Sequence, residues 1–326
     1  RDAAFAARLH RRLEGYRLAE AGDFRIFYPT NQGHEGGYVW ALGLSIGLLG
    51  LNAFAVKFPA FVFGMLTVAL TMRLTGKLVN RRAALVAGGL CAVSFFAIFT
   101  SRVGLRAVML PVFVLWLLLA LQAILTRRNG RVLWPAVSAG LALGLSIYTY
   151  TSAFALWGGV AALVVALALF DRYTLRSTWQ PLALVVIIGC VVSLPMIIAR
   201  ATDPDGFNRS SSISRPLTDA LAGQPQELID NGVKLLGMAA FTGDPEARYN
   251  VPTNAFYPLI VGLAAYVGIA IAVWRLRKQP LYAALLGIMA VGLVPSLLTV
   301  SAPSFLRSIA LLPGLSAGRR VIALDF

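Results

Sequence analysis

Residues 107–126 read AVMLPVFVLWLLLALQAILT, a run of twenty positions without a charged side chain. As an α-helix, about 20 residues rise roughly 30 Å, which matches the hydrocarbon core of a bilayer. Apolar runs of comparable length recur along nearly the whole sequence. We therefore expect an all-α integral membrane protein, built as a multi-span helical bundle with outer-face loops and interfacial helices.

The composition supports this fold class. Hydrophobic residues make up 58% of the 326 positions and charged residues only 13%, too apolar a balance for a soluble domain to cover itself with polar surface. The formal net charge of +15 would suggest a nucleic-acid partner in a soluble protein. Here most Lys and Arg residues lie in short loops between apolar runs, which is typical of membrane topology. The expected partner is the membrane, with no nucleic acid.

Eight apolar runs have the length that a membrane crossing needs: 53–73, 84–101, 107–126, 133–150, 153–170, 182–199, 257–274 and 281–299. The stretch from Gly37 to Leu51 is shorter and rich in Gly, which predicts an interfacial or re-entrant helix. Phe305 to Leu315 is apolar but too short to predict a further span. Cys91 and Cys190 fall inside apolar runs, so we expect packing residues, not a disulfide.

Alternate loops differ in their basic residues, which predicts the orientation. The side expected to face the cytoplasm carries Arg73, Lys77, Arg81, Arg82, Arg127, Arg128, Arg131, Arg172, Arg176, Arg275, Arg277 and Lys278. We expect a multi-pass protein of the plasma membrane, with its active groups on the non-cytoplasmic face. Four parts follow: a first outer loop (1–36), a transmembrane bundle (37–199), a large outer loop (200–256) with a surface helix at Glu227–Phe241, and C-terminal spans (257–326).

Two arginines, Arg102 and Arg106, stand four residues apart where one predicted span ends on the outer side and the next begins. A guanidinium group binds phosphate through paired hydrogen bonds, so this pair is a candidate site for the phosphate of a lipid-linked donor. The alternative is interfacial anchoring, which is common for Arg at the ends of spanning helices.

Two outer segments carry candidate ligands for a sugar or an acceptor. Asp244, Glu246, Arg248 and Asn250 crowd into a turn just before a span, and such groups can orient hydroxyls and a phosphate. Glu35 follows His34 directly before the interfacial helix, where a carboxylate can accept a proton or bind a hydroxyl. A plain solvated loop is the alternative in both places. With only His10 and His34 in the chain, no metal site is predicted.

The sequence contains no phosphate-binding Gly-Lys-Ser/Thr loop, no dinucleotide fingerprint and no paired-Cys cluster. Its spans hold almost no acidic residues, which weighs against an ion-coupled transporter. A lipid or small-solute transporter without bond-breaking chemistry stays as the alternative function. A third possibility is a non-catalytic binding or assembly subunit.

Five segments, in order, resemble the polyprenyl-phosphate-dependent GT-C glycosyltransferases of the protein mannosyltransferase and aminoarabinose transferase type. They are Phe24–Glu35, which looks like the family's first outer loop; Ala55–Gly64, with Lys57 where Arg is usual; Ser101–Arg106, similar to "SRxGLR"; Phe241–Pro252, similar to "GD...RxNxP"; and Pro303–Ser308, similar to "PhxlR". The resemblance runs through most of the chain. It implies a membrane enzyme rather than a transporter.

The resemblance implies inverting transfer of a sugar from a polyprenyl-phosphate donor to a lipid, glycan or protein acceptor outside the cytoplasm, in some members beside a divalent metal. In such enzymes an acidic residue of the first outer loop deprotonates or orients the acceptor. Its expected position here reads Ala7–Arg12 and contains no acid. Asp2 and Glu14 are nearby but do not fit the motif, so the catalytic base is left unassigned. This departure predicts either a fragment that lacks its catalytic acid or a degenerate member of the family, and the opening at Arg1 favours the fragment.

Overall fold

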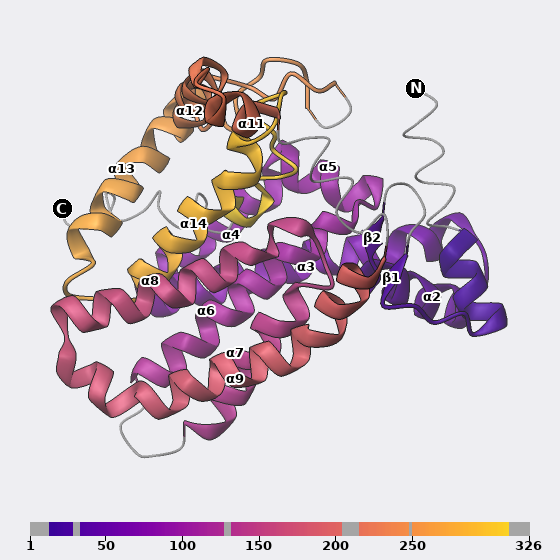
Figure 1. Cartoon of the computed structure of the whole chain (residues 1–326), viewed down its shortest axis with the longest axis horizontal. Helices are drawn as coiled ribbons and strands as arrows, with labels where there is room; N and C mark the ends of the chain where they lie inside the picture. The colour runs from indigo at the N-terminus through magenta and orange to yellow at the C-terminus, as the bar shows by residue number, and fades with distance from the viewer. Residues whose placement is uncertain (1–12, 29–32, 127–131, 204–214, 248–249, 313–326) are drawn as a thin grey trace.

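The computed structural model describes residues 13–28, 33–126, 132–203, 215–247 and 250–312. Helices dominate these ranges, and the strands within them form one two-stranded hairpin. The helices run mostly along one another as a bundle, with the hairpin and α2 gathered at one end and α12 and α13 at the other (Figure 1). This arrangement confirms the predicted all-α membrane class.

The elements follow the predicted order. They are β1 (Phe27–Tyr28), β2 (His34–Glu35), α2 (Gly37–Leu49), α3 (Ala53–Leu78), α4 (Arg81–Val93), α5 (Phe95–Val103), η1 (Arg106–Met109), α6 (Leu110–Thr126), α7 (Leu133–Ser146), η2 (Thr151–Ala153), α8 (Phe154–Phe170), α9 (Arg172–Thr202), α11 (Arg215–Leu221), α12 (Gln226–Gly237), α13 (Leu259–Arg275), α14 (Leu281–Leu297) and η3 (Ile309–Leu311). Residues 13–21 are also helical.

Local sequence explains where several helices begin. The side chains of Asn52, Asn80 and Asp171 each accept a hydrogen bond from a backbone N–H three residues further on, at the starts of α3, α4 and α9. Such caps satisfy N–H groups that have no partner within the helix. Asp171 thereby starts α9 ten residues before the apolar run that was predicted to span, so the helix reaches 31 residues.

The centre of the bundle is α6. In the most apolar 18-residue segment of residues 106–126, 72% of the positions are buried inside the protein. The corresponding segment of α3 is only 22% buried. Leu115, Leu117, Leu118 and Leu121 are fully buried or nearly so. The helices around α6 pair as α3 with α4, α7 with α9 and α8 with α14. Because α3 keeps most of its apolar surface exposed, its outward side is suited to lipid.

Within the described ranges, four helices are long and apolar enough to cross a membrane: α3, η1 with α6, η2 with α8, and α9. A fifth span arises if α4 and α5 count together. The helices α7, α13 and α14 are apolar but have only 14 to 17 residues. The chain is thus a multi-pass membrane protein, and the helices at three of the eight predicted crossings are shorter than the predicted runs.

The predicted continuous span 84–101 is wrong in one respect. Its helix breaks at Ser94 and bends by 56° between α4 and α5. Ser94 takes an extended conformation there, with φ of −63° and ψ of 125°, and ends α4. The division into four parts stays a prediction. The predicted interfacial helix and the predicted surface helix correspond to α2 and α12, and η3 lies in the last apolar stretch.

Candidate active site

Three segments that are distant in the sequence meet at a buried ion pair. Glu35 lies on β2, Arg106 starts η1 between α5 and α6, and Thr151 starts η2 between α7 and α8. Arg106 Nη1 lies 2.7 Å from Glu35 Oε2, and the two side chains are only 7% and 5% exposed. Thr151 Oγ1 donates a hydrogen bond of 3.1 Å to Glu35 Oε1. The two charges are therefore mutually neutralised in a site that largely excludes water.

The hairpin fixes Glu35 in this position. Its two strands are antiparallel, and Phe27 pairs with Glu35. The chain then turns through Gly36 and Gly37, whose N–H groups donate to Ile26 O at 3.0 Å and Tyr148 O at 2.9 Å. The second bond fastens the start of α2 to the turn after α7. Glu35 is thus held by backbone contacts on both sides, as a preorganised site requires.

The turn that carries the two arginines separates them. Gly104 ends α5 in the left-handed conformation with φ of 73°, which suits a residue without a Cβ. The chain reverses there, so Arg106 is buried while Arg102 stays exposed in the last turn of α5. The Arg106 guanidinium also lies 5.4 Å from the centre of the Tyr150 ring. The sequence spacing alone had placed both guanidinium groups in one site.

The charge of Glu35 is set by its surroundings. Burial opposes ionisation, but the Coulombic attraction of Arg106, a backbone hydrogen bond, the Coulombic attraction of Arg200 and the Thr151 hydroxyl together hold the pKa of Glu35 below its ordinary value. Arg200 lies in the last turn of α9. Glu35 is therefore an anion at neutral pH, paired with the Arg106 guanidinium.

A second buried pair joins His34 of the hairpin to Glu14. His34 Nε2 is 2.9 Å from Glu14 Oε2, and both side chains are almost fully buried. The Tyr28 ring stacks on the imidazole, with centroids 5.7 Å apart. The pair links helical residues 13–21 to the hairpin. His34 is thus a packed, partnered residue and not the solvated loop residue that its Gly neighbours indicate.

Asp244 lies in the loop between α12 and α13 and is 1% exposed. Its two carboxylate oxygens accept hydrogen bonds from Glu246 N and Phe305 N, both 2.8 Å long. Asn250 donates to Asn254 O at 2.7 Å and to Asp244 O at 3.4 Å. Burial raises the pKa of Asp244 even though those backbone N–H groups oppose the shift. These contacts join the loop after α12 to the segment after α14. Arg248 lies outside the described residues.

Among the described residues, no three His, Cys, Asp or Glu side chains gather closely enough to hold a metal ion. The buried acids among the described residues lie apart from one another: Glu35 is paired with Arg106, Glu14 with His34, and Asp244 with backbone N–H groups.

The family model described as dolichyl-phosphate-mannose-protein mannosyltransferase matches residues 37–198, about half of the chain. The match begins two residues after Glu35 and contains both Arg102 and Arg106. This chain belongs to the GT-C glycosyltransferases. No curated protein matches it.

Solved structures show the same GT-C fold. ArnT from Cupriavidus metallidurans bound to undecaprenyl phosphate is 16% identical, with a TM-score of 0.57 over 94% of this chain and 54% of that one. AglB from Archaeoglobus fulgidus, in complex with an inhibitory peptide and a dolichol-phosphate, is 14% identical, with a TM-score of 0.58 over 96% and 45%. The oligosaccharyltransferase of that archaeon with Zn and sulfate is 16% identical, with a TM-score of 0.60 over 95% and 44%. Our chain spans about half the length of these proteins.

The sequence alone does not indicate that Thr151 bonds Glu35, that Tyr150 lies against Arg106, or that Arg200 acts on the charge of Glu35. Tyr150, Thr151 and Arg200 are all more than a hundred positions from Glu35 in the sequence. Each stands at or beside the end of a predicted span, and the orientation rule predicts that these ends share one side with Glu35. The pairing of individual side chains was not predictable.

The lowered pKa of Glu35 predicts that the stability of the folded protein depends on pH. The pKa of Glu35 is lower in the folded protein than in an unfolded chain, so folding releases protons from this group. Its contribution to stability is present above the ordinary Glu pKa of about 4.3 and is lost as the pH falls through the folded value. We expect acidification below about pH 4 to lower the unfolding temperature in detergent, and Glu35→Gln to reduce this pH dependence.

The control for this measurement is Asp230→Asn, which alters an exposed carboxylate on α12. It should leave the acid response as in the unaltered protein. An acid response that is the same with Glu35→Gln as without it would contradict the assignment to Glu35.

Proposed function

We propose that the protein transfers a sugar from a polyprenyl-phosphate donor to an acceptor on the non-cytoplasmic side of the plasma membrane. The GT-C fold supports this class of reaction. The observation that carries the proposal is the buried Arg106 guanidinium, which Glu35 and the Tyr150 ring hold at the turn that follows the exposed Arg102. Guanidinium groups bind phosphate through paired, charge-assisted hydrogen bonds, so the two arginines of this turn suit the donor phosphate.

In this proposal Arg106 and Arg102 have different tasks. Arg106 is held by Glu35 and Tyr150, so its guanidinium is preorganised and cannot turn freely to follow a ligand. Arg102 is exposed at the end of α5, where a phosphate at the membrane surface can reach it first. We assign Arg102 to capture of the phosphate and Arg106 to its final orientation. This arrangement suits a head group that enters from the bilayer.

Glu35 then orients Arg106, and through it the donor. The contacts of Asp244 and Asn250 are with the polypeptide, which supports a role in positioning the outer loops rather than direct sugar binding. The catalytic base is not among these assignments. The sugar and the acceptor, whether lipid, glycan or protein, also stay open.

The test is release of sugar from radiolabelled polyprenyl-phosphate sugars by the full-length protein in liposomes, with and without candidate acceptors. Arg102→Ala should raise the donor KM about 5- to 30-fold with a smaller change in kcat, because loss of a charge-assisted hydrogen bond weakens donor binding. The readout is initial rate against donor concentration.

The matched control is Arg215→Ala, because Arg215 is another exposed outer arginine and stands on α11. It should leave the donor KM unchanged. An equal KM increase from both variants would indicate a general surface-charge effect. Movement of intact lipid across the bilayer with no bond cleavage would overturn the transferase proposal in favour of the transporter.

A further inference from the structure

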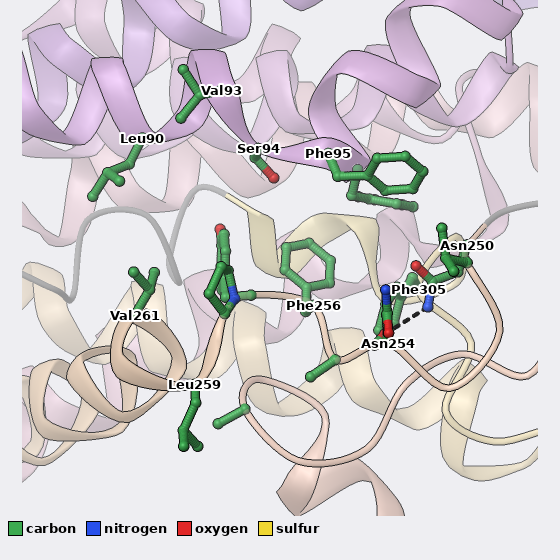
Figure 2. Close-up of a pocket in the computed structure, with 16 residues that line it drawn as sticks. Leu90, Val93, Ser94, Phe95, Asn250, Asn254, Phe256, Leu259, Val261 and Phe305 are labelled. Atoms are coloured by element: carbon green, nitrogen blue, oxygen red, sulfur yellow. Dashed lines mark hydrogen bonds between the residues drawn. The ribbon is translucent and has the colours of Figure 1, made fainter.

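A cavity of about 610 Å³ lies apart from the ion-pair turns. It forms where the break between α4 and α5 faces the segment that leads into α13 (Figure 2). Pockets of about 300–1,000 Å³ are typical of sites for small molecules. Phe96, Phe256 and Phe305 pack against one another at its wall, with centroids 5.0 to 6.0 Å apart. The cavity thus has a rigid aromatic wall.

The lining is mostly apolar. Among the described residues that form it, none is Asp, Glu, Lys, Arg or His. The Asn250 amide group is engaged, because Nδ2 donates to Asn254 O, as the dashed line in Figure 2 marks. A phosphate or a sugar would lose its water here without gaining charged partners, whereas a hydrocarbon chain would lose nothing. The chemistry of the wall therefore selects a lipid tail rather than a head group.

One polar group at the cavity has no partner among the described residues. Ser94 is 6% exposed, and its hydroxyl makes no hydrogen bond in this part of the chain. In Figure 2 the hydroxyl points from the helix break towards the side chains across the cavity. A buried hydroxyl without a partner is unfavourable, and an acceptor atom on a ligand would satisfy it.

Exposed apolar side chains beside the cavity connect it to the surrounding bilayer. Val93 is 70% exposed, Phe95 51% and Leu259 53%, and all three stand on apolar helices at the cavity. In a membrane-spanning bundle such side chains face lipid. The 13 residues of α4 rise about 20 Å, which places Ser94 in the half of the membrane away from the basic cytoplasmic end of α4.

We propose that this cavity binds one ester-linked acyl chain of a bilayer glycerophospholipid, with the ester carbonyl accepting a hydrogen bond from Ser94. A polyprenyl chain has no neutral acceptor along its hydrocarbon, so it would fill the cavity and leave Ser94 unsatisfied. The hydroxyl therefore favours the acyl ester. The site goes beyond the proposed sugar transfer and does not depend on it.

The test uses photo-crosslinking in phosphatidylcholine vesicles that contain the full-length protein. The probe is phosphatidylcholine with a diazirine on one acyl chain, in an ester-linked form and in the matching ether-linked form. Labelled peptides are quantified by mass spectrometry. The reference is the α3 peptide that contains Met65, a lipid-facing residue that is 58% exposed and outside the cavity lining.

We expect the ester probe to label the peptides around Ser94 and Phe256 several-fold more than the Met65 peptide. The ether probe should label them about 2- to 10-fold less than the ester probe, because it lacks the carbonyl acceptor. Ser94→Ala should remove this difference between the probes, and Ala255→Leu should reduce cavity labelling by both. The ratio of ester-probe to ether-probe labelling is measured within one variant, so a small change in the folding of that variant affects both probes alike.

Two results would overturn the proposal. One is equal labelling of the cavity and of the Met65 peptide, which would indicate ordinary contact with the bilayer. The other is loss of ester-probe labelling when undecaprenyl phosphate is added, which would assign the cavity to a polyprenyl chain. None of these measurements depends on sugar transfer, so a negative result would leave the proposed function unaffected.

Discussion

Arg106→Met is expected to abolish sugar transfer and to lower the free energy of unfolding by about 3–5 kcal/mol. Met fills a similar volume but leaves the buried Glu35 carboxylate without its ionic partner. Breaking a buried ion pair from one side costs about this much, since the remaining charge is uncompensated. The measurements are thermal unfolding in detergent micelles and the liposome assay of sugar release.

The double variant with Glu35→Gln and Arg106→Met separates the two effects. It removes both charges, so we expect most of the stability to return. Removing both members of a buried ion pair costs far less free energy than removing one and leaving the other charge uncompensated. Transfer should stay lost, since no guanidinium orients the donor phosphate. Full recovery of transfer in the double variant would show that Arg106 serves only to neutralise Glu35.

Gly37→Val is the second large effect we expect. A Cβ at Gly37 would lie 2.5 Å from Tyr148 O, which is a backbone atom and cannot move aside cheaply. The side chain would push α2 and the hairpin away from the turn after α7. We expect a loss of about 1–3 kcal/mol of stability from overpacking. Transfer should fall at least about tenfold, because small displacements of positioning groups are costly in catalysis.

Gly47→Ala is the matched control in the same helix. A Cβ there meets nothing within 4 Å. We expect stability to be unchanged or to rise by up to about 1 kcal/mol, since Ala is the better helix former. Unfolding temperature and initial transfer rate report on both variants. A Gly37→Val protein as active as the Gly47→Ala protein would show that the contact with Tyr148 is not needed for the site.

The fold was largely predictable from sequence because one physical requirement dominates it: backbone polar groups must be hydrogen-bonded within the bilayer. A long uncharged run such as 107–126 must cross the bilayer as a helix, whatever its neighbours are. The break at Ser94 was not predictable in the same way. No Gly or Pro stands at that position, and the conformation of Ser94 depends on the loops that pack against the bend. Local sequence therefore predicts spans better than it predicts their bends.

The candidate site was predictable only in part. Arg102, Arg106 and Glu35 were selected from the sequence because they are charged residues beside apolar runs, and the structure pairs Arg106 with Glu35. Spacing could not show that Gly104 would turn one arginine inward and leave the other exposed. The contacts of Asp244 with Phe305 and of Glu35 with Thr151 join turns that are distant in sequence. Such pairings depend on how the helices pack.

The short helices α13 and α14 have a consequence for the surrounding bilayer. Each has 17 residues and rises about 25 Å, less than the roughly 30 Å of an average hydrocarbon core. Just after α13, the Lys278 ammonium lies 5.7 Å from the centre of the Trp274 ring, an aromatic and cationic pair of the kind that anchors helices at the water boundary. Where helices of this length cross a bilayer, the hydrophobic mismatch draws the two leaflets together around them.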